Sequence, residues 1–141
     1  MWREKTLQGP EETIPITSIS AYILETGRSM RIAVIGSRSF ANTKLMEEEL
    51  NKITGIEEIV SGGAQGADSL AESYAKRNGI RTRIFKPQYE KFGRSAPLVR
   101  NRLIIRHSDL VIAFWDGKSR GTKYTIDYAQ SENKPVQIIL F

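Results

Sequence analysis

The sequence predicts an α/β fold, a single domain with a mostly parallel five-stranded sheet and helices on both faces. Two observations predict it. From Met30 onward, short strands rich in Ile, Val and Phe alternate with segments of helical periodicity, as in sheets that are covered on both sides. Glycine- or serine-rich stretches follow several of these strands directly. The length of 141 residues suits one such domain.

We expect strands at 31–35, 58–61, 82–85, 110–115 and 136–141. Helices are expected between them at 43–53, 67–78, 97–107 and 122–132. The second helix has the clearest pattern, because apolar residues recur at i, i+3, i+4, i+7 and i+8 from Ala67, and Asn78-Gly79 ends it. Pro97 suits the first turn of the third helix. Right-handed crossovers then give an open, three-layer Rossmann-like sheet ordered about 3-2-1-4-5.

The chain divides near Met30. Residues 1–29 lie outside the alternation and are interpreted as an N-terminal extension, with an edge strand at 13–17 and a short helix or strand at 19–24. Residues 30–141 form the domain. Its longest expected loop runs from 87 to 96 and places Tyr89 and Phe92 where they can cover a site.

Composition narrows the classes of function. There is no cysteine, so disulfides and thiolate zinc sites are excluded, and one histidine leaves only carboxylate-based metal binding. We expect no metal and no cofactor. The N-terminus has no signal-peptide core and the chain has no long apolar run, which predicts a cytoplasmic protein without a membrane partner. The net charge of +5 favours anionic ligands.

Four polar stretches follow the first four strands. In an open α/β sheet the ligand crevice lies outside the carboxyl ends of the strands, so we expect the four stretches to form one site. They are GSRSF at 36–40, SGGAQGAD at 61–68, the 87–96 loop with the helix after it, and WDGKSRGT at 115–122.

The turn GGAQG at 62–66 is the candidate phosphate cradle. Without side chains, its backbone N–H groups can approach an anion, and the next helix directs its positive end at the same place. The turn matches neither the dinucleotide fingerprint nor a P-loop, and a plain strand-to-helix turn is the alternative interpretation. Asp68 is either a helix cap or an acceptor for ribose hydroxyl groups.

The other stretches add donors and an aromatic ring. Arg38 and its neighbouring serines offer guanidinium and hydroxyl groups, although Ser39 or Asn42 also suits a helix N-cap. Trp115 either stacks on a base or belongs to the core. The candidate ligand-binding residues are Gly36, Ser37, Arg38, Ser39, Gly62, Gly63, Ala64, Gln65, Gly66, Asp68, Arg100, Asn101, Trp115, Gly121 and Thr122.

The segments RIAVIGSRSF, VSGGAQGADSLAESYA, RNRLIIRHSDLVIAFWDG and SRGTKYTIDYA resemble the YspA-type branch of the SLOG superfamily. This superfamily includes the DNA-processing (Smf) proteins and the Lonely Guy phosphoribohydrolases. The resemblance covers about residues 30–141. It implies a Rossmann-like fold that binds nucleotides or nucleotide derivatives, and assembly into a dimer or larger homo-oligomer.

The catalytic branch of the superfamily offers a closer comparison. Arg100 stands in the place of its catalytic arginine, but the glutamate of its PGGxGTxxE motif is missing after Gly121-Thr122. Cleavage of an N-glycosidic bond needs a carboxylate near the developing positive charge. Asp68, Asp116 and Asp127 are the candidates, and Asp116 is better placed than Asp127. If the chain is an enzyme, it is expected to hydrolyse nucleoside monophosphates with Arg100, Asp68 and Asp116 as catalytic residues.

Three functions therefore stay open. The first is binding of a nucleotide or nucleotide-derived ligand whose phosphate is held by the glycine-rich loops, and the missing glutamate favours it. The second is the N-glycosidase activity of a phosphoribohydrolase. The third is binding of single-stranded nucleic acid, which the DNA-processing relatives and the interleaved basic and aromatic residues of 86–94 suggest.

Overall fold

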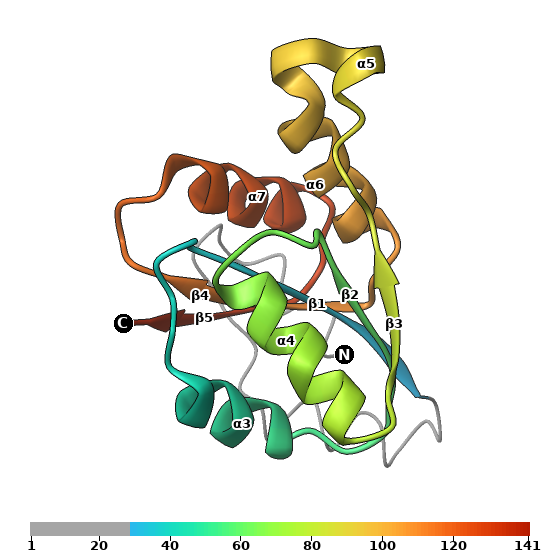
Figure 1. The fold of residues 1–141 in the computed structure, drawn as a ribbon, viewed down its shortest axis with the longest axis vertical. Helices are drawn as coiled ribbons and strands as arrows, with labels where there is room; N and C mark the ends of the chain where they lie inside the picture. The colour runs from blue at the N-terminus through green and yellow to red at the C-terminus, as the bar shows by residue number, and fades with distance from the viewer. Residues whose placement is uncertain (1–28) are drawn as a thin grey trace.

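The computed structural model describes residues 29–141 (Figure 1). The segments expected at 13–17 and 19–24 lie outside the described residues. The described chain forms one parallel sheet in the order β3-β2-β1-β4-β5. The α/β fold class and the strand order expected from the sequence are thereby confirmed.

Every strand and helix expected in this part of the chain is present, with bounds that differ by at most two residues. The structure adds two short helical segments between β3 and α6. In chain order the elements are β1 (Met30–Gly36), α3 (Thr43–Asn51), β2 (Ile56–Ser61), α4 (Ala67–Arg77), β3 (Arg81–Ile84), α5 (Tyr89–Phe92), the 3₁₀ helix η1 (Gly93–Ser95), α6 (Ala96–Arg106), β4 (Leu110–Trp115), α7 (Arg120–Ser131) and β5 (Val136–Leu140).

Two layers of helices cover the sheet, α3 and α4 on one face and α6 and α7 on the other (Figure 1). Side chains alternate along β1, so that Ile32 and Val34 pack toward α3 and α4 while Ala33 and Ile35 pack toward α6 and α7. The buried helix side chains include Met46, Leu50, Ala71 and Ala75 on the first face and Ile104, Ile105, Ile126 and Ala129 on the second.

The strand order reverses between β1 and β4, which pair in parallel at the centre of the sheet. The chain leaves β1 toward α3 on one face and leaves β4 toward α7 on the other. The two connections diverge at the carboxyl ends of these strands, and the opening between them is where open α/β sheets bind ligands.

The segment expected as a loop at 87–96 is largely helical. The carbonyl of Gln88 accepts hydrogen bonds from the N–H groups of Lys91 and Phe92 at 3.1 and 3.0 Å, which closes a helical turn. We call residues 89–95 the arm. It packs on α6 and projects beyond the rest of the domain (Figure 1). In the described part of the chain, the helices are too short or too polar to cross a membrane.

Candidate ligand-binding pocket

A pocket of about 430 Å³ lies at the carboxyl end of β1. Its volume falls in the range that small-molecule sites occupy. All four polar stretches contribute to it, as the sequence predicts. The lining residues are Ile35, Gly36, Ser37, Arg38 and Ser39 from β1 and its loop, Ala64 and Asp68 from the loop after β2 and α4, Pro97, Arg100, Asn101 and Ile104 from α6, and Ser119, Gly121, Thr122 and Thr125 from α7 and the residue before it.

Most of the candidate residues meet in this pocket. Of the candidates for ligand binding or catalysis, those that do not line it are Gly62, Gly63, Gln65, Gly66, Trp115 and Asp116. Thr125 and Ile104 were not among the predicted site residues, yet they line the pocket beside Gly121 and Arg100. Each of the two follows its neighbour by four residues on the same helix, so the helical periodicity provides a signal that would have found both.

Arg100 ties the glycine-rich turn to α6. The residue is only 8% exposed, and Nη1 donates to the carbonyl of Gly62 at 2.6 Å and to that of Phe85 at 3.3 Å. A Cβ atom on residue 62 would lie 2.5 Å from Nη1, so only glycine permits this contact. Nε donates to Oδ1 of Asn101 at 2.8 Å. Nη2 has no hydrogen bond to the described residues.

The turn after β2 packs directly on the loop after β1. Gly66 has a φ of +81°, and a Cβ atom there would lie 2.5 Å from the carbonyl oxygen of Ser37 and 2.6 Å from that of Arg38. A side chain at this position would therefore separate the two loops. The glycines shape the turn, whereas Ala64 in the turn and Asp68 in the first turn of α4 line the pocket.

Asp68 closes the turn instead of capping the first N–H groups of its own helix. It is 9% exposed, and Oδ2 accepts a hydrogen bond from the backbone N–H of Ala64 at 3.1 Å. Burial raises the pKa of Asp68 to about 6, although the Ala64 hydrogen bond and the charge of Arg100 act in the opposite direction. The carboxylate of Glu72 adds a smaller upward effect. Asp68 therefore changes its charge at a pH about two units higher than an ordinary aspartate does.

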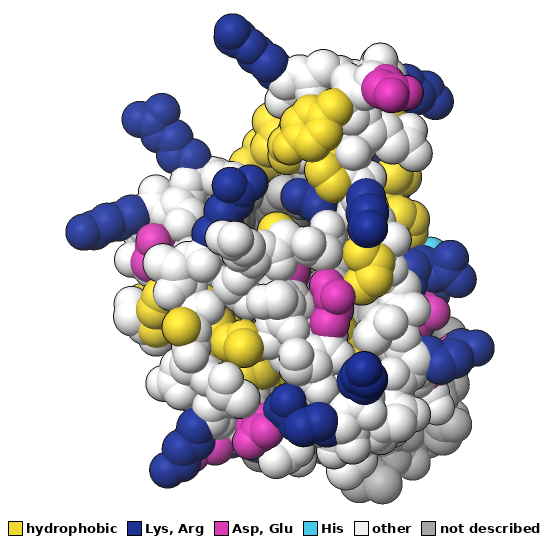
Figure 2. All heavy atoms as spheres, in the orientation of Figure 1, with side chains coloured by type: hydrophobic (Ala, Val, Ile, Leu, Met, Phe, Trp, Pro, Cys, Tyr) yellow, Lys and Arg dark blue, Asp and Glu magenta, His cyan; other side chains and the backbone are white. Residues whose placement is uncertain are grey.

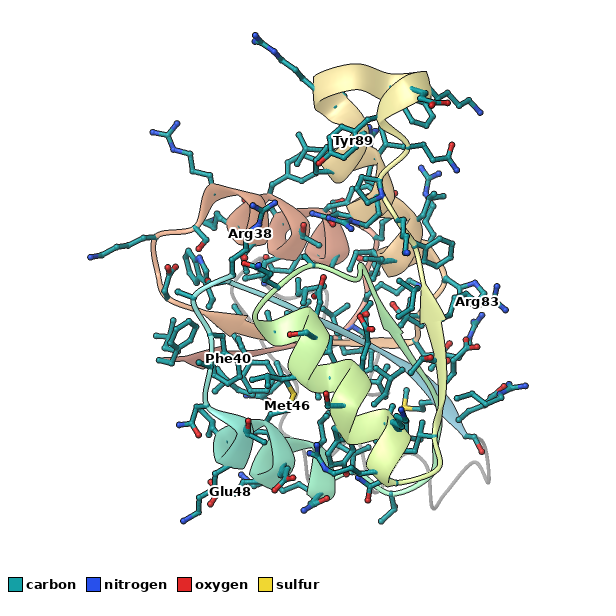
Figure 3. All side chains as sticks on the ribbon, viewed as in Figure 1. Arg38, Phe40, Met46, Glu48, Arg83 and Tyr89 are labelled. Carbon is teal, nitrogen blue, oxygen red and sulfur yellow. The ribbon has the colours of Figure 1, made fainter. Side chains whose placement is uncertain are left out.

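Arg38 supplies a second cation to the pocket. Its guanidinium is exposed and makes no hydrogen bond or ion pair with the described residues, and its charge helps to lower the pKa of Arg100. Burial is the main cause of that lowering, and Asp68 opposes it. Figure 3 shows Arg38 on the loop after β1, at the same end of the domain as α7. Two guanidinium groups thus share the pocket with one carboxyl group whose pKa is raised to about 6.

A network of hydrogen bonds connects the loop after β1 to the loop after β4. Ser37 is 2% exposed, and its Oγ accepts from the N–H of Asp116 at 3.2 Å and lies 2.8 Å from Oγ of Ser119. Oδ1 of Asp116 accepts from the N–H groups of Lys118 and Ser119 at 2.9 and 2.8 Å. These bonds, the one from Ser119 first, lower the pKa of Asp116 to about 2.

The carboxylate of Asp116 is therefore used to shape the β4–α7 loop, outside the pocket. Asp127 pairs with Lys123 at 2.8 Å on the exposed side of α7. Asp68 is the carboxylate residue that lines the pocket in the described chain.

Trp115 also supports this loop. Its indole N–H donates to the carbonyl of Ser119 at 3.1 Å, and its ring packs against the core between the sheet and the α6 and α7 helices. Asn101 connects the two helices, because Nδ2 donates to Oγ1 of Thr125 at 2.9 Å. Both side chains help to fix the start of α7 beside the pocket.

The strand order, together with a pocket built from the β1, β2 and β4 loops and α6, defines a Rossmann-like ligand-binding type of domain. Residues 30–92 match the sequence model of the YspA, cpYpsA-related SLOG family. This match confirms the resemblance to the YspA-related branch of the SLOG superfamily that the motifs indicate.

Relatives of the chain include the Gene 61 protein of Mycobacterium phage D29. The two are 28% identical in an alignment 116 positions long, which covers 75% of this chain and 93% of that protein.

Two solved structures have a similar fold. The DNA processing protein A of Helicobacter pylori, studied for its single-stranded DNA binding mode, has a TM-score of 0.62 and 27% identity over 79% of this chain and 66% of its own. DNA processing protein A of Streptococcus pneumoniae has a TM-score of 0.62 and 23% identity over 78% of this chain and 50% of its own. The chain therefore matches about two thirds and one half of these proteins.

Proposed function

We propose that the pocket binds a nucleotide or a nucleotide-derived ligand and that Arg38 and Arg100 contact its phosphate. The observation that carries the proposal is the unpaired guanidinium of Arg38, which lines the pocket beside the partly free guanidinium of Arg100. Guanidinium groups bind phosphate through paired, charge-assisted hydrogen bonds.

The rest of the lining suits the same ligand. Ser39 and Thr122 add hydroxyl groups, and the first turn of α7 brings backbone N–H groups and the positive end of a 12-residue helix. Asp68 and Asn101 are acceptors of the kind that ribose hydroxyl groups require. Ile35 and Ile104 supply apolar surface for the remainder of the ligand.

Calorimetric titration with a panel of nucleoside 5′-monophosphates tests the proposal. Arg38→Gln should weaken binding by about tenfold or more, because one charge-assisted hydrogen bond contributes about 1.5–3 kcal/mol. Arg77→Gln is the matched control. Arg77, in the last turn of α4, carries the same charge as Arg38, but it already forms an ion pair with Glu47 at 2.6 Å. If both variants bind with equal affinity, Arg38 does not contact the ligand. If the wild type binds none of the monophosphates, the proposed function is wrong.

Binding of single-stranded DNA is a second candidate, favoured by the similarity to the Helicobacter pylori protein. Lys86, Lys91 and Arg94 lie on or beside the arm and would follow a phosphate backbone. Fluorescence anisotropy with a labelled oligonucleotide should show affinity that falls steeply as salt is added. If the oligonucleotide does not bind even at low salt, this candidate function is wrong.

Hydrolysis of the N-glycosidic bond is a third candidate, favoured by the position of Asp68. A carboxyl group with a pKa of about 6 inside the pocket is suited to general acid–base catalysis near neutral pH. The assay is chromatographic detection of free base after incubation with each monophosphate. Release that Asp68→Asn abolishes would support hydrolysis, and tight binding without release would reject it.

Two further expectations belong with the proposal. The resemblance to SLOG proteins implies a homo-oligomer, which light scattering after size-exclusion chromatography measures directly. The predicted cytoplasmic location is tested by cell fractionation of the full chain.

A further inference from the structure

Three aromatic side chains are exposed in the described part of the chain, namely those of Tyr89, Phe92 and Phe141. Two of them have partners. Nζ of Lys91 lies over the ring of Phe92, 5.3 Å from its centroid, and the ring of Phe141 meets that of Phe40 at 4.9 Å. Tyr89 is 56% exposed and has no ring contact or hydrogen bond with the described residues. Its ring is thus the unpartnered aromatic surface of this set.

Tyr89 lies close to the pocket. It is the first residue of α5, which packs on α6, and its phenol interacts electrostatically with the guanidinium of Arg100. Figure 3 shows Tyr89 on the side of the arm that faces the rest of the domain. In Figure 2, hydrophobic side chains of the arm overhang a hollow where Lys and Arg side chains gather. An aromatic surface and a cationic pocket are therefore neighbours.

We propose that the Tyr89 ring is the stacking platform for the nucleobase of the ligand whose phosphate contacts Arg38 and Arg100. This inference rests on the proposed function and narrows it: the ligand of the pocket retains its base and is not a bare sugar phosphate. The arm then supplies a second point of attachment, outside the pocket that holds the phosphate.

The chemistry of the two surfaces fits this division. Every nucleobase is a flat π system, so any of them can stack on a tyrosine ring. A phosphate group instead needs cations at fixed positions. Phe92 is a weaker candidate because Lys91 already occupies one face of its ring. Tyr89 has two rotatable side-chain bonds before its ring, so ordering it on a base loses little conformational freedom.

The test compares adenosine 5′-monophosphate with ribose 5-phosphate, which has the same phosphate and sugar but no base. Both are titrated into the wild-type chain, Tyr89→Ala, Tyr89→Phe and the control Phe92→Ala. Tyr89→Ala should lower the affinity for the monophosphate by about tenfold, the loss expected for one base–aromatic stack, and leave that for ribose 5-phosphate unchanged. Tyr89→Phe and Phe92→Ala should bind both compounds as the wild type does.

The outcomes separate this inference from the proposed function. If the wild type binds the monophosphate and Tyr89→Ala weakens neither ligand, or weakens both equally, the stacking role is wrong while the phosphate site stands. If Phe92→Ala gives the larger selective loss, the platform is Phe92 and the assignment to Tyr89 is overturned. If the wild type binds neither compound, the proposed function fails and the stacking subsite fails with it.

Discussion

Asp68→Asn should make the protein more stable at neutral pH. Burial raises the pKa of Asp68 from 3.8 to about 6, a shift of about two pH units. One unit corresponds to about 1.4 kcal/mol, so the ionised carboxylate destabilises the folded state by about 3 kcal/mol. Asp68 is 9% exposed, and solvent screening reduces this figure little.

The sign of the pH dependence follows from the direction of the shift. The folded state holds the proton of Asp68 more tightly than the unfolded state, so its stabilising contribution is complete below pH 3.8 and is lost as pH rises through about 6. Asparagine does not titrate, and its side-chain oxygen can still accept the hydrogen bond from Ala64. The variant should therefore gain about 2–3 kcal/mol over the wild type near neutral pH and progressively less toward acid pH.

Urea unfolding followed by far-UV circular dichroism, at a series of pH values between about 4 and 8, measures this difference. Asp127→Asn is the control, since Asp127 is exposed and pairs with Lys123 one helical turn away, a contact worth about 0.5 kcal/mol or less. A gain that is the same at every pH, or an Asp68→Asn variant less stable than the wild type near neutral pH, would refute the reasoning.

Three other predictions follow from the same contacts. Sulfate, which does not titrate near neutrality, should bind on the order of tenfold more weakly as pH rises through the Asp68 pKa of about 6, and calorimetry should show no such dependence in Asp68→Asn. Gly66→Ala should lower the free energy of unfolding by about 2–5 kcal/mol because it combines a positive φ with backbone overlap. Gly79→Ala should lower it by only about 1–2 kcal/mol, since residue 79 has open space around it, and equal losses would contradict the overlap. Ser37→Ala should cost about 1–3 kcal/mol in the same urea assay, because it leaves the N–H of Asp116 without its partner, and an unchanged midpoint would contradict the network.

The fold was predictable because its signals are local and repeated. Short apolar strands that alternate with helical periodicity give the order of elements, and the handedness of crossovers gives the sheet order. The convergence of the polar stretches, and the presence of Arg38, Asp68 and Arg100 in the pocket, then follow from the topology alone.

The roles of individual side chains in the loops were less predictable. Asp116 and Trp115 follow or end β4, at the height of the pocket, yet each bonds to the turn that leads into α7. Which way such a side chain turns depends on the backbone conformation of a few loop residues, and hydrophobic periodicity carries no information about it. The helical turns of the arm were missed for a related reason, since four residues are too few to show a period.

Mapping a bound nucleotide by NMR tests the central claim most directly. Adenosine 5′-monophosphate is titrated into the ¹⁵N-labelled chain, and the amide resonances that shift are placed on the structure. We predict that the largest shifts fall on the pocket residues Ser39, Ala64, Gly121 and Thr122 and on Tyr89 of the arm. Shifts confined to other surfaces, such as α3 or the exposed edge of β3, or no shifts at all, would contradict the account.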